Sequence, residues 1–101
     1  SYIPDTKWYI EKRRLTDLSL VKYYVFNPSI GMDEVLDIEI NPVTNHLWIV
    51  GFDSIKGVSW RIEILDKDLN RIKTIRPLGC AYCKAFAITF NERGDAYVVG
   101  D

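Results

Sequence analysis

The chain has 101 residues, of which 48% are hydrophobic and 27% are charged. These values are ordinary for one globular domain or part of one, and they argue against intrinsic disorder. Thirteen basic and fourteen acidic residues give a formal net charge of -1, so the charge does not favour binding to nucleic acid. The longest apolar runs, such as residues 47–50, fall far short of the roughly 20 residues of a membrane-spanning helix.

Short β-rich runs recur along the chain and are bounded by Gly, Pro, Asn and Asp. Residues 35–40 and 60–64 alternate apolar with charged side chains, which is the period of a half-buried strand. Asn41-Pro42 and residues 91–95 are typical of turns between paired strands. We therefore predict about eight strands and no helix, with strands over residues 8–11, 19–26, 35–40, 46–50, 60–64, 71–75, 85–90 and 96–99.

The sequence aligns with itself at a period of about 50 residues, the length of a propeller blade. Residues 35–41 match residues 85–91, and residues 47–51 match residues 96–100. Residues 8–11 match residues 60–63 at nearly the same spacing. A four-stranded blade has two apolar faces and cannot bury both alone, so neighbouring blades must stack on it.

The segment AFAITFNERGDAYVVG, residues 85–100, combines an apolar strand, a polar turn with glycine and a second strand. It resembles the inner hairpin of the β-propeller repeat families of bacteria and archaea, and residues 60–70 resemble the third strand and following turn of their blades. The resemblance implies an all-β fold of antiparallel four-stranded blades, about two blades in the single segment 1–101. The implied parts are an outer half-blade at about 8–27, a full blade at about 33–77 and an inner half-blade at about 84–101.

Two blades cannot close a ring of roughly four to eight blades. We therefore expect either a fragment of a larger propeller or several copies that assemble into a ring. The expected partners are other protein chains or further blades of the same protein, including other copies in a homo-oligomer. A small β-sandwich or barrel closed by one copy is the remaining alternative.

No catalytic motif stands out in the sequence, so we expect a structural or protein-interaction role without intrinsic catalytic activity. The alternative is part of a propeller enzyme, or of a ligand- or metal-binding propeller, with its site on the central axis. The sequence leaves enzymatic activity open and indicates no cellular compartment. Five dispersed acids are candidates for lining such a channel, and the sequence does not choose among Asp37, Glu39, Asp53, Asp95 and Asp101.

Cys80 and Cys83 form a C-x-x-C pair, which can close a local disulfide, bind Zn²⁺ or act as a redox pair. A structural zinc site needs four ligands, and His46 is the only histidine. We therefore predict a local Cys80–Cys83 disulfide or inert thiols. A zinc site of Cys80, Cys83 and His46, completed by other copies in an assembly, stays open as an alternative. We expect no other cofactor.

Two further patterns have a structural interpretation. Residues 66–70 open like a calcium loop, but Arg71 and Pro77 stand where such a loop requires Gly and Glu, so a polar turn is predicted. Tryptophan buries a large apolar area, so we expect the tryptophans to pack between blades rather than to stack on a ligand. On that basis Trp60→Ala is expected to cost several kcal/mol, by analogy with about 3–5 kcal/mol for buried tryptophans. The tryptophans are Trp8, Trp48 and Trp60.

Overall fold

The computed structural model of the chain describes residues 5–77 and 81–101. In these ranges the chain forms eight strands: β1 (Trp8–Arg13), β2 (Leu20–Phe26), β3 (Glu34–Ile40), β4 (Leu47–Asp53), β5 (Ser59–Leu65), β6 (Arg71–Ile75), β7 (Ala85–Phe90) and β8 (Ala96–Gly100). They pair antiparallel in sheets of two, four and two strands, ordered β1-β2, β3-β4-β5-β6 and β7-β8. The predicted all-β fold is therefore confirmed. The described part of the chain contains no helix that could cross a membrane, and none of its three sheets closes on itself.

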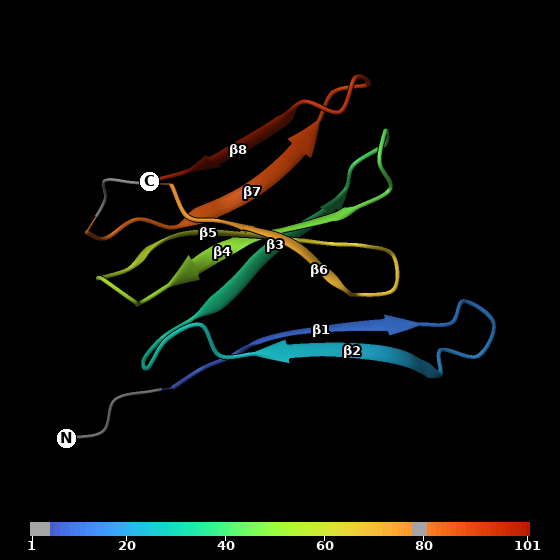
Figure 1. Cartoon of the computed structure of the whole chain (residues 1–101), viewed down its shortest axis with the longest axis horizontal. Coiled ribbons are helices and arrows are strands. Elements are labelled where there is room, and N and C mark those ends of the chain that lie inside the picture. The colour runs from blue at the N-terminus through green and yellow to red at the C-terminus, as the bar shows by residue number, and fades with distance from the viewer. Residues whose placement is uncertain (1–4, 78–80) are drawn as a thin grey trace.

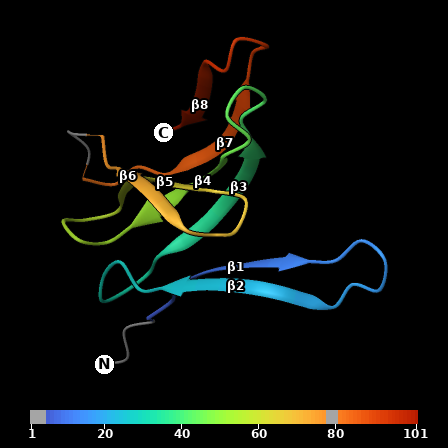
Figure 2. The same ribbon diagram turned by 45° about the vertical axis from the view of Figure 1, so that its right-hand side comes forward.

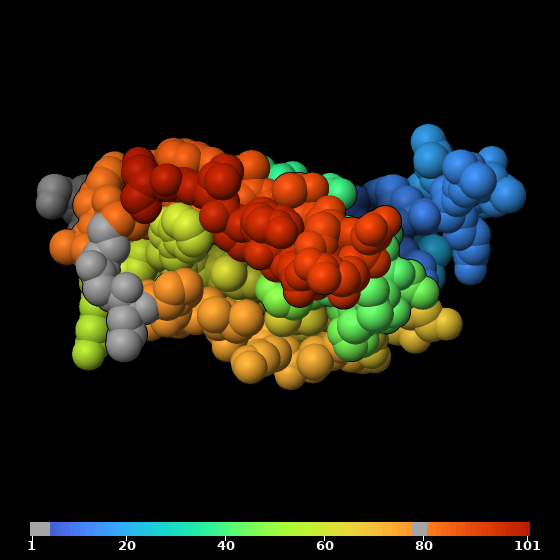
Figure 3. All heavy atoms as spheres, turned by 90° about the horizontal axis from the view of Figure 1, so that it is seen from above, coloured from blue at the N-terminus to red at the C-terminus, as the bar shows by residue number. Residues whose placement is uncertain are grey.

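The three sheets stack as layers (Figures 1 and 2). The β1–β2 hairpin covers one face of the β3–β6 sheet, and the β7–β8 hairpin covers the other face. Figure 3 looks onto the β7–β8 hairpin, and the tip of the β1–β2 hairpin extends beyond the other two layers in that view. The middle sheet is therefore flanked by a hairpin on each face.

Two hydrophobic cores hold the layers together. Successive side chains of a strand point to opposite faces of its sheet, so the middle sheet contributes to both cores. The first core, next to β1–β2, contains Trp8, Ile10, Ile49, Leu65 and Leu69. The second, next to β7–β8, contains Val50, Ile62, Ile64, Ala85 and Ile88.

The prediction that residues 60–64 form a half-buried strand is wrong in one respect. The apolar members of β5 face the second core, as the alternation indicates. Arg61 and Glu63 lie on the opposite face of β5, and they are buried as well because the β1–β2 hairpin covers that face. Charge alternation alone therefore does not reveal that both faces of a strand are covered.

The β3–β4 and β7–β8 hairpins share a local distortion. A bulge over residues 35–37 lies opposite Gly51, and a bulge over residues 85–87 lies opposite Gly100. A Cβ atom built on either glycine would overlap the main-chain oxygen of the residue that precedes the bulge. Each bulge thus requires a residue without a side chain on the partner strand.

Four hairpin turns contain the same kind of capping interaction. In each turn the side-chain oxygen of an Asp or Asn accepts a hydrogen bond from the main-chain N–H two residues later, as in Asx turns. The residues that make this bond are Asp17, Asn41, Asp66 and Asn91. Each turn also holds one residue with positive φ: Leu18, Asn45, Leu69 or Gly94. The predicted polar turn at residues 66–70 is confirmed.

Candidate functional site

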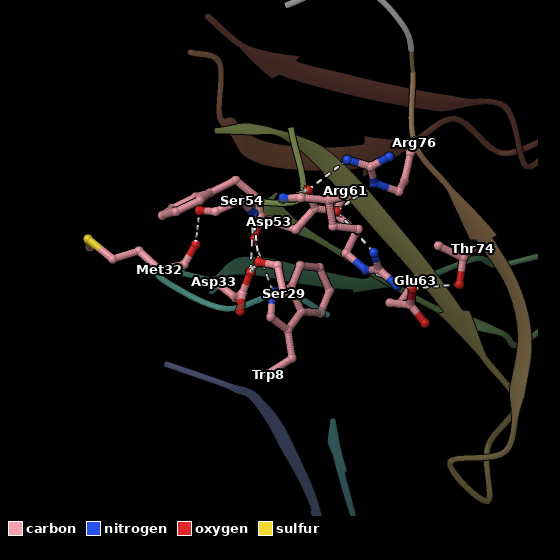
Figure 4. A network of polar contacts seen from close by, with 12 residues as sticks. Trp8, Ser29, Met32, Asp33, Asp53, Ser54, Arg61, Glu63, Thr74 and Arg76 are labelled. Atoms are coloured by element: carbon pink, nitrogen blue, oxygen red, sulfur yellow. Dashed lines mark hydrogen bonds and ion pairs between the residues drawn. The ribbon is translucent and has the colours of Figure 1, made fainter. Parts of the chain in front are cut away.

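A cluster of five charged side chains lies between the β1–β2 hairpin and the middle sheet, and Figure 4 labels four of them. Asp53 ends β4, and Arg61 and Glu63 stand two residues apart on β5, so they share one face of the sheet. Arg71 begins β6 and Arg76 follows it. The carboxylates of Asp53 and Glu63 are inaccessible to solvent, so we name this group the buried ion cluster.

Asp53 is held by two arginines. Arg76 forms a fork with it, because Nε donates to Oδ2 over 2.6 Å and Nη2 donates to Oδ1 over 2.8 Å. Arg61 Nη1 donates to the same Oδ2 over 2.9 Å. Burial opposes the ionisation of Asp53, but the hydrogen bonds from Arg76 and Arg61 outweigh it and hold its pKa below the usual value.

Glu63 is held by three donors from its own sheet. Arg61 Nε and Arg71 Nε donate to its two carboxylate oxygens over 3.1 Å and 2.9 Å. Thr74 Oγ1 donates to Oε2 over 2.6 Å. Arg61 therefore joins Glu63 to Asp53, and β4, β5 and β6 are connected through their side chains as well as through their main chains.

The β1–β2 hairpin also contacts the buried ion cluster. The guanidinium carbons of Arg61 and Arg71 each lie 4.8 Å from the centre of the Phe26 ring, within cation–π range. The Tyr24 hydroxyl donates to Glu63 Oε1 over 3.5 Å. Burial, and then the charge of Glu63, raise the pKa of Tyr24 above its usual value. The cluster thus joins two layers.

Asp33 is a further buried acid beside the cluster, in the connection between β2 and β3. Its Oδ1 accepts hydrogen bonds from the Ser29 hydroxyl and, over 3.2 Å, from the Ser54 main-chain N–H. Its Oδ2 is buried and has no hydrogen-bond partner among the described residues. Burial raises the pKa of Asp33 above its usual value.

The chemistry of the buried ion cluster favours a structural role. Every carboxylate oxygen of Asp53 and Glu63 already accepts a hydrogen bond from an arginine. A general base must be free to take a proton from a substrate within hydrogen-bond reach. Neither carboxylate meets that condition, whereas both fix strands and layers in place.

The structure separates the residues of the predicted zinc site. His46 lies in the turn before β4, beside the turn at residues 66–68. Cys83 lies at the other end of the sheet, where its N–H donates to Val58 O over 2.7 Å. The seven residues of β4 separate these ends by about 20 Å, at about 3.3 Å per residue. Cys80 lies outside the described residues, so the Cys80–Cys83 disulfide stays a prediction. His46 and Cys83 of one copy lie too far apart to bind the same ion, so the alternative zinc site would need ligands from different copies.

The five acids proposed for a channel do not gather at one place. Asp37 Oδ2 accepts the Ile88 main-chain N–H over 3.0 Å and so connects β3 to β7. Asp101 Oδ1 accepts the Lys84 N–H over 2.8 Å at the end of β8. Asp53 belongs to the buried ion cluster, whereas Glu39 and Asp95 are exposed on β3 and in the β7–β8 turn. The sequence did not single out Arg61, Glu63 or Asp33.

Two tryptophans make the same kind of contact at successive layers. Trp8 on β1 donates its indole N–H to the Phe52 main-chain oxygen on β4, over 3.2 Å. Trp60 on β5 donates its indole N–H to the Asp101 main-chain oxygen, just after β8, over 2.9 Å. Trp48 and Trp60 also pack against the second core. The expectation that these tryptophans pack between layers therefore agrees with their contacts.

No family model matches this sequence, and no curated protein or solved structure matches it either. The proposals below therefore depend on the contacts of the chain itself.

Proposed function

We propose that this chain is a segment of a β-propeller, about two blades in extent, with a structural or protein-interaction role and no catalytic activity of its own. In this assignment β3–β6 is one full blade, β1–β2 is the outer half of the preceding blade and β7–β8 is the inner half of the following blade.

The repeated tryptophan contact carries the proposal. Trp8 is the first residue of β1, and Trp60 is the second residue of the matching strand β5. Trp8 donates to the Phe52 oxygen near the end of β4, and Trp60 donates to the Asp101 oxygen just after β8, the strand that matches β4. One packing arrangement therefore joins the first layer to the second and the second to the third. Stacked repeats produce this relationship because each unit meets its neighbour through equivalent surfaces.

The matching bulges are a second support. Gly51 and Gly100 occupy the same place in their hairpins, 49 residues apart, and each faces a bulge on the preceding strand. Bulges are specific local features of a sheet, and a glycine in a strand often marks one. Their agreement favours two units of one repeat over three unrelated layers.

The buried ion cluster and the exposed outer faces favour a structural role. Both carboxylates of the cluster are engaged by arginines between layers. Apolar side chains of the two outer layers remain exposed, among them Tyr9, Tyr23, Tyr97 and Val99. Exposed apolar faces of this kind are suited to contact with further protein.

Tandem arrays test the proposal. Chains that contain two, three or four copies in series hold about four, six or eight blades, the range in which propellers close. We expect one array length to show a sharp rise in the urea midpoint of unfolding and a compact radius of gyration by X-ray scattering. A radius of gyration that grows steadily with each added copy would indicate an open stack and would contradict the propeller.

A further inference from the structure

An apolar groove of about 400 Å³ runs along β1, between that strand and the face of β3 and β4 that the β1–β2 hairpin leaves uncovered. β1 is hydrogen-bonded to β2 alone among the described strands, so its other edge is open. In this groove Ile38 and Ile40 are 41% and 59% exposed. Its apolar lining includes Ile10, Ile38, Ile40, Leu47 and Leu69.

The β7–β8 hairpin has the complementary features at the other end of the chain. β8 is paired with β7 alone in the described part of the chain, so β8 also has an open edge. Tyr97 and Val99 point away from the second core, and they are 55% and 60% exposed. An open edge and an apolar face are the two features that strand addition requires.

The middle sheet shows how the two open edges would meet. On its face next to β7–β8, Trp48 packs edge-on against Phe90, with ring centres 5.4 Å apart. β4, which carries Trp48, pairs with β5. In the repeat alignment β8 corresponds to β4 and β1 corresponds to β5. We infer that the groove beside β1 binds the β7–β8 hairpin of a second copy of this chain, with β8 of that copy paired to β1.

The register follows from the pairing of β4 with β5, in which Val50 lies opposite Ile62. The corresponding residues place Val99 of the second copy opposite Ile10. The contact between Trp48 and Phe90 has a counterpart as well. Tyr97 of the second copy corresponds to Trp48, and it packs on Ile40 of the first copy, which corresponds to Phe90. This inference rests on the proposed function, because it uses the repeat alignment. It adds that a second copy of the chain occupies the groove beside β1.

The turns of the two copies would also meet. In the middle sheet the turn after β3 lies beside the turn after β5, where they share a shallow depression. The corresponding arrangement places residues 91–95 of the second copy beside the β1–β2 turn, residues 14–19. That turn holds one arginine and one aspartate, so its net charge is zero and the apolar groove, not charge, favours this occupant.

A pair of variants tests the inference, because the contact is head-to-tail. Ile40→Lys blocks the groove and leaves the hairpin intact, and Val99→Lys blocks the hairpin and leaves the groove intact. Ile30→Lys is the matched control, since Ile30 is exposed in the β2–β3 connection, outside both surfaces. Each variant is compared with the wild type by native mass spectrometry, and its urea midpoint establishes that it is folded.

We expect the wild type and Ile30→Lys to form the same closed assembly of two to four copies, which holds about four to eight blades. Each blocked variant alone should be monomeric. An equimolar mixture of the two should double the mass, to a dimer that contains one chain of each kind, because one intact groove then meets one intact hairpin.

Two results would overturn the inference. One is a folded wild type that stays monomeric at every concentration, and the other is assembly of the blocked variants like the wild type. If the separate chains stay monomeric but tandem arrays close, the propeller proposal stands and only a separate second copy is wrong as occupant. If the arrays also fail to close, the propeller proposal fails too.

Discussion

The indole N–H of Trp60 donates a hydrogen bond across the layer boundary to the main-chain oxygen of Asp101, over 2.9 Å. Asp101 directly follows β8, so this bond anchors the end of the β7–β8 hairpin to the middle sheet. Trp8 makes the corresponding bond to Phe52 one layer earlier. The two contacts join successive layers in the same way.

Removal of the Trp8 side chain should be more costly than removal of the Trp60 side chain. Trp8 is fully buried, so Trp8→Ala is expected to lower the free energy of unfolding by about 3–5 kcal/mol. Trp60 is only partly buried, so the loss for Trp60→Ala should be smaller than the sequence alone indicates, about 2 kcal/mol. Urea unfolding measures both values. Equal losses, or a loss below about 1 kcal/mol for Trp8→Ala, would contradict this order.

Glu63→Gln should be strongly destabilising. The amide keeps the shape of the side chain but removes the charge that Arg61 and Arg71 face, and it leaves Arg61 buried with one carboxylate partner instead of two. Loss of one partner from a buried ion pair costs about 3–5 kcal/mol. Glu39→Gln is the control, because Glu39 is exposed, and it should change the free energy of unfolding by less than about 0.5 kcal/mol.

Stability should fall in acid through Asp53. Its pKa in the folded chain is lowered, so its contribution to stability is present above its unfolded pKa of about 3.9 and is lost as the pH falls through the folded pKa. Asp53→Asn should reduce the free energy of unfolding at pH 7 and flatten its decline below pH 4. Urea midpoints across this pH range measure both effects. An unchanged slope in the variant would show that Asp53 does not carry the acid dependence.

Asp33 should behave in the opposite sense. Its pKa is raised by burial, so the folded chain binds this proton more tightly than the unfolded chain does. The ionised carboxylate therefore destabilises the fold at neutral pH, and that cost is relieved as the pH falls through the folded pKa. Asp33→Asn is expected to have a higher urea midpoint than the wild type at pH 7. Near pH 4, where Asp33 of the wild type becomes protonated, the two midpoints should approach each other. A variant less stable than the wild type at pH 7 would contradict the assignment.

Glycine should be required at both bulges. A Cβ atom at Gly51 would overlap the main-chain oxygen of Glu34, and one at Gly100 would overlap that of Lys84. The backbone cannot move aside without breaking the strand pairing, so Gly51→Ala and Gly100→Ala should each cost at least as much as typical overpacking, about 1–3 kcal/mol. Thr89→Ala, on the exposed face of β7, is the control. Free energies of unfolding within 0.5 kcal/mol of the wild type for both glycine variants would show that the bulges tolerate a side chain.

The strands and turns could be predicted from the sequence because their signals are local. Alternation over residues 35–40 and the Asp–Asn pair of residues 66–70 specify a strand and a turn without reference to distant parts of the chain. The absence of a helix from residues 5–77 and 81–101 followed from the same signals. For these features neighbouring residues carry all the information.

The buried ion cluster could not be predicted, because its partners are distant in sequence. Asp53 meets Arg76 across 23 positions, and Arg61 meets the ring of Phe26 on another layer. The pattern Trp-Arg-Ile-Glu-Ile looks half-exposed, since it contains no sign that the β1–β2 hairpin covers its charged face. Asp33 has the same difficulty, because an acid just before a strand is usually exposed to solvent.

The repeated stacking of the layers is tested most directly by nuclear Overhauser effects from the indole protons of Trp8 and Trp60 in the isotopically labelled chain. We expect the Trp8 indole proton to show effects to Phe52, and the Trp60 indole proton to show effects to Gly100 and Asp101. Both sets together would establish that one packing arrangement joins all three layers. Effects from the Trp60 indole proton confined to β5 and β6, with the β7–β8 hairpin still formed, would contradict it.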